Sequence, residues 1–372
     1  MKSDLPEILS FFTGGGFMDM GFEKAGFNVV WSNEYDHHFA QLFSHGITSW
    51  KNAKGITGKF QITNEKSIKD ITEQEIVDEA FGGQLPKEFG IIGGPPCQDF
   101  SINGNLEGFK GDRGSLTDAY LCKILDLQPS FFIMENVTGL VKVKKNAKHF
   151  FHLLDIMREL YLIDFSVLNS LDFGVPQSRE RVFVVGINKK KYNLDSIITC
   201  TDGTWFPFPA GTKTSLEMDT AAWPEAQAFG LVPAVPEGIA INLCVESCLV
   251  PSGQENVVSN ANEYFNLKIP QEKLAAIKEG ETNRPSFKRL HRYKYSPTTC
   301  YGNNEVHLHP YQHRRLSVRE ALRIQSVEDS YALPPELPLS KKFKMIGNGV
   351  PVLMANALAE SLARYLRRLT KT

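Results

Sequence analysis

The sequence predicts an α/β protein with a doubly wound, mostly parallel sheet and a second, smaller domain of irregular and β structure. Strand-like apolar runs alternate with helix-like segments over the first 187 residues, and glycine-rich turns follow several of the runs. Such alternation is typical of a parallel sheet with helices on both faces. The chain has 372 residues, more than one core usually serves, so we expect two domains.

Composition places the chain among ordinary globular proteins, with 42% hydrophobic and 22% charged residues. Its start, MKSDLPEIL, carries charges where a signal peptide would be apolar, and no run approaches the roughly 18 apolar residues of a membrane span. The six cysteines form no CxxC pair, and Cys244 and Cys248 lack a second pair at zinc-site spacing. We therefore expect a cytoplasmic protein with free thiols and no metal site.

The charge distribution is more informative than the formal net charge of −1. Between Arg284 and Arg323 many basic residues accompany only two acids, Glu305 and Glu320. A basic segment on a neutral chain is typical of a polyanion site. The alternative is a solvated face with unmatched charges.

A strand is predicted from Glu7 to Phe12, followed by a turn of three glycines and a helix that ends before Gly26. A strand, a glycine turn and a helix open a nucleotide-binding βαβ unit, because glycines let a ligand approach the backbone. The turn does not match GxGxxG, so this signal is weak by itself.

The second predicted strand, Phe27 to Ser32, ends in the polar turn Asn33–Asp36. An acid at this position holds ribose hydroxyls in nucleotide-binding folds, which makes Glu34 a candidate, and Tyr35 beside it could stack on adenine. The alternative for Glu34 is a solvent-exposed turn acid.

The stretch FGIIGGPPCQDFS, residues 89–101, carries the first candidate for catalysis. Its apolar strand must stop at Pro95-Pro96, because proline has no N–H to donate to a ladder. Cys97 then stands on a rigid turn at a strand end, where a nucleophile is expected in an α/β protein. A buried structural thiol is the alternative. We expect the glycine-rich loop 103–114 to close over a substrate, and a helix to follow from Ser115 to Leu127.

The next strand, Ser130 to Met134, leads into Glu135. A carboxyl group flanked by apolar residues should have a raised pKa, so Glu135 is a candidate acid. Beyond it we expect a helix at 150–162 and strands at 165–171 and 181–187. Arg179 and Arg181 stand at alternate positions, so they should share a face and could grip a carbonyl or a phosphate. A surface salt-bridge ladder is the alternative for these two arginines.

From Lys189 to about Tyr311 the chain is rich in Pro, Gly, Thr and Asn, and we expect irregular and β structure there with one helix at 270–279. A second helix, 317–325, should begin with a capping box of Ser317 and Glu320. The segment 344–351 then leads into a final helix, 352–369.

As a set, these residues resemble the cytosine-5 DNA methyltransferases. The motifs occur in order over about two thirds of the chain: FFTGGGF, NEYD, GGPPCQDFS, ENV, QSRERV, RRLSVREALRIQS and IGNGVP. The resemblance implies that Cys97 attacks carbon 6 of cytosine, so that carbon 5 can take a methyl group. It further implies that Glu135 hydrogen-bonds ring nitrogen 3 and the exocyclic amine, that Arg179 holds the carbonyl at position 2, and that Arg181 supports the loop or a phosphate.

The implied methyl donor is S-adenosyl-L-methionine, and the implied partner is double-stranded DNA, bound by a monomer. The target cytosine would be flipped out, with loop 103–114 closing behind it. The implied Rossmann-like methyltransferase domain spans residues 1–187, a target-recognition domain spans 188–325, and the segment 326–372 returns to the catalytic domain, where a strand-like motif would supply Asn348. The implied cofactor pocket comprises Phe12, Gly14, Gly16, Glu34, Tyr35, Asp70, Ile71, Pro96, Leu116 and Asn348.

The chain departs from the usual family pattern at four positions. Ser10 stands where the family has Asp, Phe17 where it often has Gly, Val327 where it has Phe, and Gly349 where it often has Ser. The departures at the first motif put the affinity for the cofactor in question. Three rival functions stay open: a tRNA-type cytosine-5 enzyme, a non-catalytic DNA-binding relative, and a dehydrogenase that uses the glycine turn.

Overall fold

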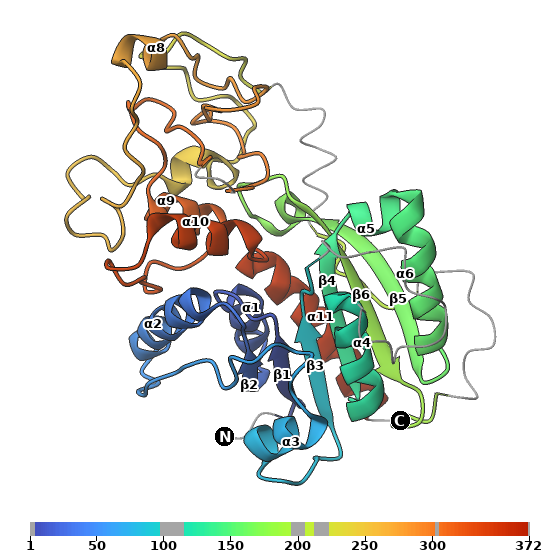
Figure 1. Cartoon of the computed structure of the whole chain (residues 1–372). Helices are drawn as coiled ribbons and strands as arrows, with labels where there is room; N and C mark the ends of the chain where they lie inside the picture. The colour runs from blue at the N-terminus through green and yellow to red at the C-terminus, as the bar shows by residue number, and fades with distance from the viewer. Residues whose placement is uncertain (1–3, 97–114, 195–204, 212–222, 302–304, 371–372) are drawn as a thin grey trace.

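A six-stranded sheet forms the centre of the molecule (Figure 1). The structure is a computed structural model that describes residues 4–96, 115–194, 205–211, 223–301 and 305–370. Along the sheet the strand order is β2-β1-β3-β4-β6-β5. The strands are β1 Glu7–Phe11, β2 Asn28–Asn33, β3 Phe89–Gly93, β4 Phe131–Val137, β5 Tyr161–Asn169 and β6 Glu180–Asn188.

The sheet is mostly parallel, as predicted. Strand β1 pairs in parallel with β2 and β3, and β3 pairs in parallel with β4. Only β6 runs against its two neighbours, β4 and β5. A short 3₁₀ helix, η2 (Ser170–Phe173), lies between β5 and β6 and allows this reversal without a long crossover.

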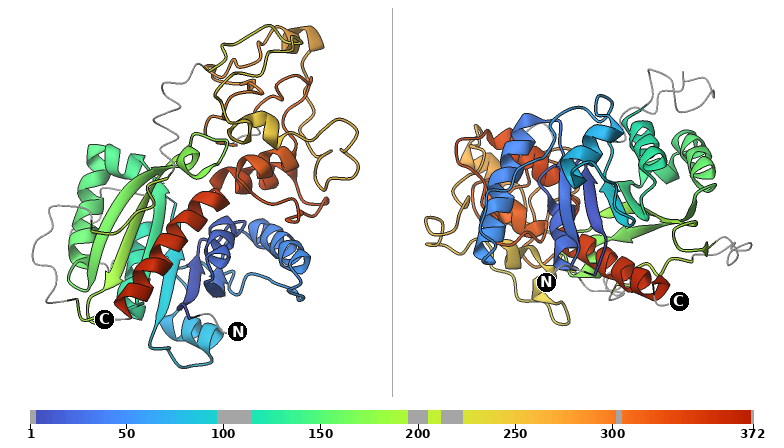
Figure 2. Two further views of the ribbon diagram at one scale, coloured as in Figure 1. Left: turned by 180° about the vertical axis from the view of Figure 1, so that it is seen from behind. Right: turned by 90° about the horizontal axis from the view of Figure 1, so that it is seen from below.

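Helices cover both faces of the sheet, because alternate strand residues point to opposite sides. On β4, Phe132 and Met134 face a core shared with α3 (Glu73–Phe81), α4 (Leu116–Leu127) and α6 (Lys144–Met157). Phe131 and Ile133 face the other core, which α1 (Phe17–Lys24) and α11 (Val352–Leu369) complete. Figure 2 shows α11 along one face with α4 and α6 on the other. This is the doubly wound arrangement that the alternation of segments predicts.

The C-terminal segment returns to the first helix, in agreement with the expectation from the sequence. Helix α11 crosses α1 so closely that a Cβ atom on Gly21 would stand 2.5 Å from the Cβ of Ala355. A third core joins α1 to α2 (His37–Ala53), α9 (Val318–Ile324) and α10 (Leu339–Asn348). In Figure 1, helices α9 and α10 lie between the sheet and the upper part of the molecule. Residues from both ends of the chain therefore share one core.

The region between β6 and α9 contains less regular structure than predicted. Over its described residues there is no named strand, only isolated bridges such as Arg289 with Leu308. Its helices are short: η4 Ile241–Leu243, η5 Val245–Cys248 and α8 Gln271–Ala275. Over the described residues the predicted region is therefore mostly irregular, and its β structure is limited to isolated bridges.

Several predicted bounds need correction. The helix expected at 150–162 spans Lys144–Met157, because the aromatic and β-branched run from Tyr161 pairs with β6 as strand β5. The short helix α5 (Gly139–Lys142) and the long α2 and α10 were not predicted at all. The helix expected at 270–279 is only five residues long. The capping box of α9 and the bounds of α11 agree with the prediction.

Candidate active site

The predicted site segments meet at one edge of the sheet, because the parallel strands end in register. Phe11, the last residue of β1, is opposite Asn33 of β2 and Gly93 of β3, and Gly93 is opposite Met134 of β4. The glycine turn, Glu34 and the proline turn follow the ends of β1, β2 and β3, and Glu135 is the residue after Met134 within β4. Ligands bind outside the carboxyl ends of the strands in open α/β sheets, so this edge is the candidate site.

The glycine turn is held in an unusual backbone conformation. Phe12, Gly14 and Gly16 have φ angles of 53°, 57° and 74°, all in the left-handed region. Glycine adopts this region at little cost, but an aromatic residue such as Phe12 rarely does, and such strain concentrates at functional sites. A Cβ atom on Gly16 would stand 2.7 Å from the ring of Phe43, so glycine is required there for space as well.

Glu34 ties the end of β2 to the glycine turn. Its Oε2 accepts a hydrogen bond from the Gly14 N–H at 2.9 Å, and its Oε1 accepts from the Asp36 N–H at 2.8 Å. Burial raises the pKa of Glu34 above its usual value, and these backbone donors oppose the shift. The neighbouring Tyr35 is 73% exposed. The alternative of a solvent-exposed turn acid therefore does not describe Glu34.

The structure describes each of the remaining predicted cofactor residues. Ile71 belongs to a large core cluster, and Phe12 and Leu116 pack against it. The Ile71 carbonyl accepts a hydrogen bond from Lys123 Nζ, which fixes the loop to α4, and Asp70 beside it is exposed. Pro96 is exposed at the end of the β3 turn.

Asn348 stands on a helix and not on the strand-like motif expected. It is the exposed last residue of α10. Three residues earlier, Met345 packs on the glycine turn, since a Cβ atom on Gly15 would stand 2.9 Å from its Sδ. The amphipathic pattern of LSKKFKMIGN could have indicated this helix.

Two of the departures from the family pattern, Phe17 and Gly349, are in contact, so the size of one limits the size of the other. Phe17 is 1% exposed, and its ring lies so close to Gly349 that a Cβ atom on this glycine would stand 2.3 Å away. The large residue at 17 thus requires the small one at 349. The third departure is Ser10, which stands where the family has Asp. Its hydroxyl donates to the buried Asp19 at 2.7 Å. A carboxyl group is therefore still present beside β1, but it is supplied by a residue of α1.

A buried ion pair stands beside the proline turn. Arg181 Nε lies 2.9 Å from Glu135 Oε1, with the two side chains 12% and 11% exposed. Glu135 is inside β4 and not after it, and it shares a sheet face with Arg181 because Phe183, its cross-strand partner, is two residues away. Gly94 makes room for the carboxyl group, since a Cβ atom there would stand 2.9 Å from Glu135 Oε2. Asn136 donates to the Pro95 carbonyl at 2.9 Å and so fixes the turn.

The electrostatics of this pair follow from its burial. Desolvation raises the pKa of Glu135 above its usual value, while Arg181 and Arg179 lower it. Burial thus favours the protonated form of the carboxyl group, which can donate, and the two arginines favour the charged form. The expectation of a raised pKa agrees with this environment.

Arg179 precedes β6 and is fully buried, so the surface salt-bridge alternative fails for it. Its Nη2 donates to the Gly347 carbonyl at 2.9 Å, and Nη1 donates to the Thr299 carbonyl at 3.4 Å. Its Nε is buried and has no hydrogen-bond partner among the described residues. Burial lowers the pKa of Arg179 to about 9, so it stays charged at neutral pH. It joins the sheet to the end of α10.

Three buried polar residues that the sequence did not single out complete this junction. Gln177 Oε1 accepts from the N–H and hydroxyl of Thr299 at 3.0 and 3.1 Å, and its Nε2 donates to Gln325 Oε1 at 3.0 Å. Gln325 in turn donates to the Ile346 carbonyl at 2.6 Å. Gln177 and Gln325 belong to the quoted motifs QSRERV and RIQS, so the motifs carried a signal for them. Thr299 had none.

Cys97 and the loop 103–114 lie outside the described residues. The structure therefore places the partners predicted for the cysteine and not the cysteine itself. Pro95 and Pro96, which precede it in the chain, are at the carboxyl edge between the glycine turn and Glu135.

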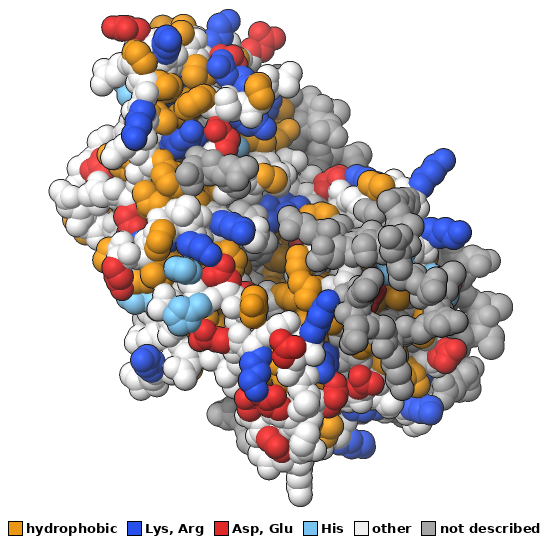
Figure 3. Space-filling model, viewed as in Figure 1, with side chains coloured by type: hydrophobic (Ala, Val, Ile, Leu, Met, Phe, Trp, Pro, Cys, Tyr) orange, Lys and Arg blue, Asp and Glu red, His pale blue; other side chains and the backbone are white. Residues whose placement is uncertain are grey.

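The basic segment 284–323 is not the exposed patch that its composition predicted. Arg289, Arg292, Arg315 and Arg319 are all less than 9% exposed. Arg289 donates to the carbonyls of Leu274, Ile277, His309 and Gln312, and Arg292 pairs with Glu279 at 2.9 Å. In the view of Figure 3, basic, acidic and apolar side chains are intermixed. Composition could not distinguish structural arginines from exposed ones.

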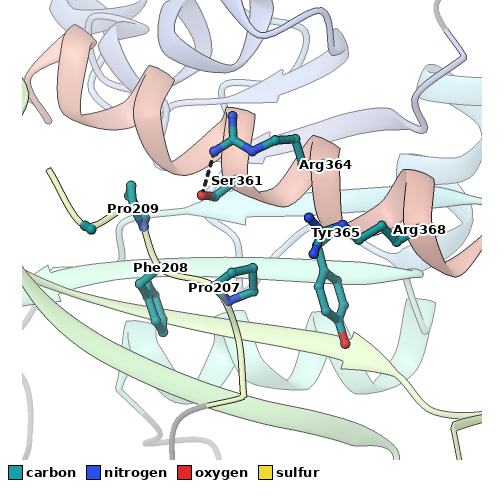
Figure 4. A pocket seen from close by; sticks show the side chains of 8 residues that line it. Pro207, Phe208, Pro209, Ser361, Arg364, Tyr365 and Arg368 are labelled. Atoms are coloured by element: carbon teal, nitrogen blue, oxygen red, sulfur yellow. Dashed lines mark hydrogen bonds between the residues drawn. The ribbon is translucent and has the colours of Figure 1, made fainter.

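The described residues show a cavity away from this edge and no cluster of metal ligands. In the part of the chain that is described, no three His, Cys, Asp or Glu side chains are placed to hold a metal ion, and no helix has the length and apolar content to cross a membrane. A cavity of about 220 Å³ lies between residues 207–210 and α11 (Figure 4). Arg364 and Ser361, which line it, bond to each other at 3.1 Å. None of its lining residues belongs to the predicted site.

Comparison with known proteins decides the family. Residues 7–364 match the family model described as C-5 cytosine-specific DNA methylase. The chain belongs to this family. The methylase is 37% identical over 366 residues to the type II methyltransferase M.NmeDI of Neisseria meningitidis serogroup C, covering 96% of this chain and 84% of that protein. It is 30% identical over 369 residues to M.FnuDI of Fusobacterium nucleatum, covering 97% and 95%.

Solved structures share the fold of the methylase. A prophage-encoded DNA modification methyltransferase from E. coli superposes with a TM-score of 0.65 at 22% identity, covering 97% of this chain and 99% of that one. A Dnmt2 structure from Spodoptera frugiperda superposes with a TM-score of 0.59 at 16% identity, covering 98% and 99%. At these identities the likeness concerns the fold alone.

Proposed function

We propose that the methylase transfers a methyl group to carbon 5 of a flipped-out cytosine within a specific double-stranded DNA sequence, through a covalent bond between Cys97 and carbon 6. The observation that carries this proposal is the buried Glu135–Arg181 pair beside the turn that leads into Cys97. Carbon 5 of cytosine is a poor nucleophile. Addition of a thiolate at carbon 6 turns the ring into an enamine that can attack a methyl group.

In this proposal Glu135 stabilises the charge that develops on the ring. A carboxyl group at nitrogen 3 supplies a proton or a short hydrogen bond as electrons move toward that nitrogen. Its raised pKa favours the form that can donate, and Arg181 fixes its orientation by the 2.9 Å contact. After methyl transfer, loss of the proton on carbon 5 lets the bond to the Cys97 sulfur break, which restores the ring and the thiolate.

One of the two arginines has a different proposed role from the one that the resemblance implied. Arg181 orients Glu135, in place of the loop or phosphate contact expected for it. Arg179 keeps the role of holding the carbonyl at position 2, because its Nε is a buried donor without a partner among the described residues. A charged donor aimed at a carbonyl would stabilise negative charge there.

The family uses S-adenosyl-L-methionine, and we propose that it binds at the glycine turn. When bound, this cofactor supplies an electrophilic methyl group. Gly14 and Gly16 allow close approach to the backbone, Glu34 retains lone pairs for ribose hydroxyls, and Tyr35 offers an exposed ring for the adenine. We propose that Asp70, Ile71, Pro96, Leu116 and Asn348 complete the pocket, with Phe12 beneath it.

The predicted division of the chain also stays a proposal: residues 1–187 catalytic, 188–325 target recognition, and 326–372 returning to the first. We further propose that the enzyme acts as a monomer in the cytoplasm. Relatives called type II methyltransferases support a role in a restriction-modification system. Light scattering of the purified protein with and without duplex DNA would test the monomer.

Bisulfite sequencing of DNA from cells that express the chain tests the reaction and reads the target sequence together. We expect protected cytosines within one short sequence. Methyl transfer to duplex DNA and to tRNA should be assayed in parallel, and transfer to tRNA alone would support the RNA enzyme instead.

Replacement of Cys97 tests the covalent step. Cys97→Ser should abolish methyl transfer, and the wild type should become trapped on duplex DNA that carries 5-fluorocytosine, because fluorine at carbon 5 cannot leave as a proton does. Cys122→Ser, a half-buried thiol on α4, is the matched control and should stay active. An active Cys97→Ser enzyme would refute the mechanism.

A further inference from the structure

Tyr331, which follows α9, reaches across the molecule to the glycine turn. Its hydroxyl donates a hydrogen bond to the Gly15 carbonyl at 2.8 Å, between residues 316 positions apart in the chain. The side chain is fully buried. Burial keeps the pKa of Tyr331 well above its usual value, so the hydroxyl carries its proton at any working pH and remains a donor.

The ring of Tyr331 is held from two sides. It meets the Phe17 ring edge-on, with centroids 5.6 Å apart, and it lies directly on the backbone of α2, where a Cβ atom on Gly46 would stand 2.1 Å from it. Its own carbonyl accepts from Arg319 Nη2 at 2.8 Å. The hydroxyl is therefore aimed by rigid packing and not by chance contact.

The glycine turn needs such a restraint. Three of its residues have left-handed backbone conformations, which persist only where the surroundings impose them. Thr13 donates its N–H to the Asn33 carbonyl at 3.0 Å, and Gly14 donates to Glu34. Both of these contacts come from the end of β2 and the residue after it. The contact at Gly15 comes from Tyr331, which belongs to the core shared with α2, α9 and α10.

We propose that Tyr331 is a positioning residue for the cofactor site: it fixes the Gly15 peptide, and through it the turn that receives S-adenosyl-L-methionine. This inference rests on the proposed cofactor site and names a residue of the C-terminal segment as part of its support. The segment 326–372 would thus have a second role besides covering the sheet: support of the glycine turn.

Tyr331→Phe removes only the hydroxyl and leaves the ring packing intact. A buried carbonyl that loses its donor costs free energy, so the turn should relax toward other conformations. We expect the dissociation constant of S-adenosyl-L-homocysteine, measured by calorimetry, to rise by about fivefold to tenfold. The KM for the methyl donor should rise similarly, with kcat at saturation and the KM for DNA near the wild-type values.

Tyr161→Phe is the matched control. Tyr161 is also fully buried and also donates to backbone carbonyls, those of Ile124 and Pro129, at the start of β5. Both variants should lower the melting temperature, but only Tyr331→Phe should weaken cofactor binding. Equal dissociation constants for Tyr331→Phe and wild type would overturn the inference, as would an equal loss in both variants. A wild type that does not bind the ligand would instead overturn the proposed cofactor site.

Discussion

The sheet and the region 223–316 satisfy their buried backbone groups in different ways. In the sheet, strands bond to strands, and large apolar clusters cover both faces. In the region 223–316 only isolated bridges occur among the described residues. Part of this region joins the third core, through residues such as Val245, Leu290 and Val306, and the rest forms small clusters, such as the one around Leu274, Ile277 and Leu308. Arginine side chains take over there, because a guanidinium group offers five donors in a fixed plane.

Arg289 illustrates the difference. Its side chain donates to four carbonyls and lies 4.2 Å from the centre of the Phe229 ring. Arg319 serves the same purpose for the carbonyls of Ser259, Glu328 and Tyr331. A region of mostly irregular backbone can thus be held by the hydrogen bonds of single arginine side chains, without strand ladders. In this region, arginines that bind backbone carbonyls account for part of the basic composition, so a basic segment does not by itself indicate a DNA-binding surface.

The largest expected effect comes from removing such an arginine. Arg289→Met removes the donor from the carbonyls of Ile277, His309 and Gln312, whereas the Leu274 carbonyl keeps the N–H of Ile277. The change should lower the stability of this region by about 3–5 kcal/mol. Hydrogen exchange should become faster in 270–316 and stay slow in the sheet, with cofactor binding retained and DNA binding lost. Arg284→Met, a half-exposed arginine of the same region, is the control. Unchanged exchange near Arg289 would contradict the comparison.

The second prediction concerns Glu135, a buried charged residue in the sheet. Unlike Arg289, it is proposed to act in the reaction and not in holding the fold. Glu135→Gln keeps the size of the side chain and an acceptor for Arg181, so the fold should hold. Turnover should fall about 10²–10³-fold, the usual loss for one group that stabilises developing charge. Glu180→Gln, an exposed acid of β6, is the control. If cofactor binding fell as much as turnover, Glu135 would have a structural role instead.

The third prediction tests whether the large side chain at position 17 requires a small one at position 349. Gly349→Ser places a Cβ atom against the Phe17 ring and should cost about 1–3 kcal/mol of stability. In a Phe17→Ala background the same change should cost little, because the space is free. Chemical denaturation of the four proteins gives the coupling energy. Additive costs would show that the two positions are independent.

The fourth prediction concerns the pH dependence of stability that Asp19 contributes, which is gradual and spread over several pH units. Burial raises the pKa of Asp19 to about 7, above the ordinary 3.8, although Ser10 opposes the shift. Between these values the folded protein holds a proton that the unfolded chain has released, so stability falls as pH rises from about 4 to about 7. The slope is at most about 1.4 kcal/mol per pH unit.

Asp19→Asn should flatten that slope in unfolding experiments at several pH values. Asp126→Asn on α4 serves as the control, because no buried carboxyl is removed and the slope should persist. A slope that survives in Asp19→Asn would assign the titration to another group.

Much of the site could be predicted because it depends on local signals. Strand ends, glycine turns and the proline turn are legible in sequence, and parallel strands must bring their carboxyl ends to one edge. The strand bounds around 161–188 were misjudged because an antiparallel pair, and not local propensity, decided them. Helices α2 and α10 have amphipathic patterns that could have indicated them, but only the structure shows that their apolar faces complete the core shared with α1 and α9.

By itself, the sequence determined the fold class, the family and the residues that meet at the carboxyl edge, because each depends on motifs in fixed order along the chain. Only the tertiary structure decided which arginine pairs with Glu135, that the basic segment is largely buried, and that Tyr331 supports the glycine turn. These contacts join residues far apart in the chain. Their partners are chosen by packing geometry, which local sequence patterns do not record.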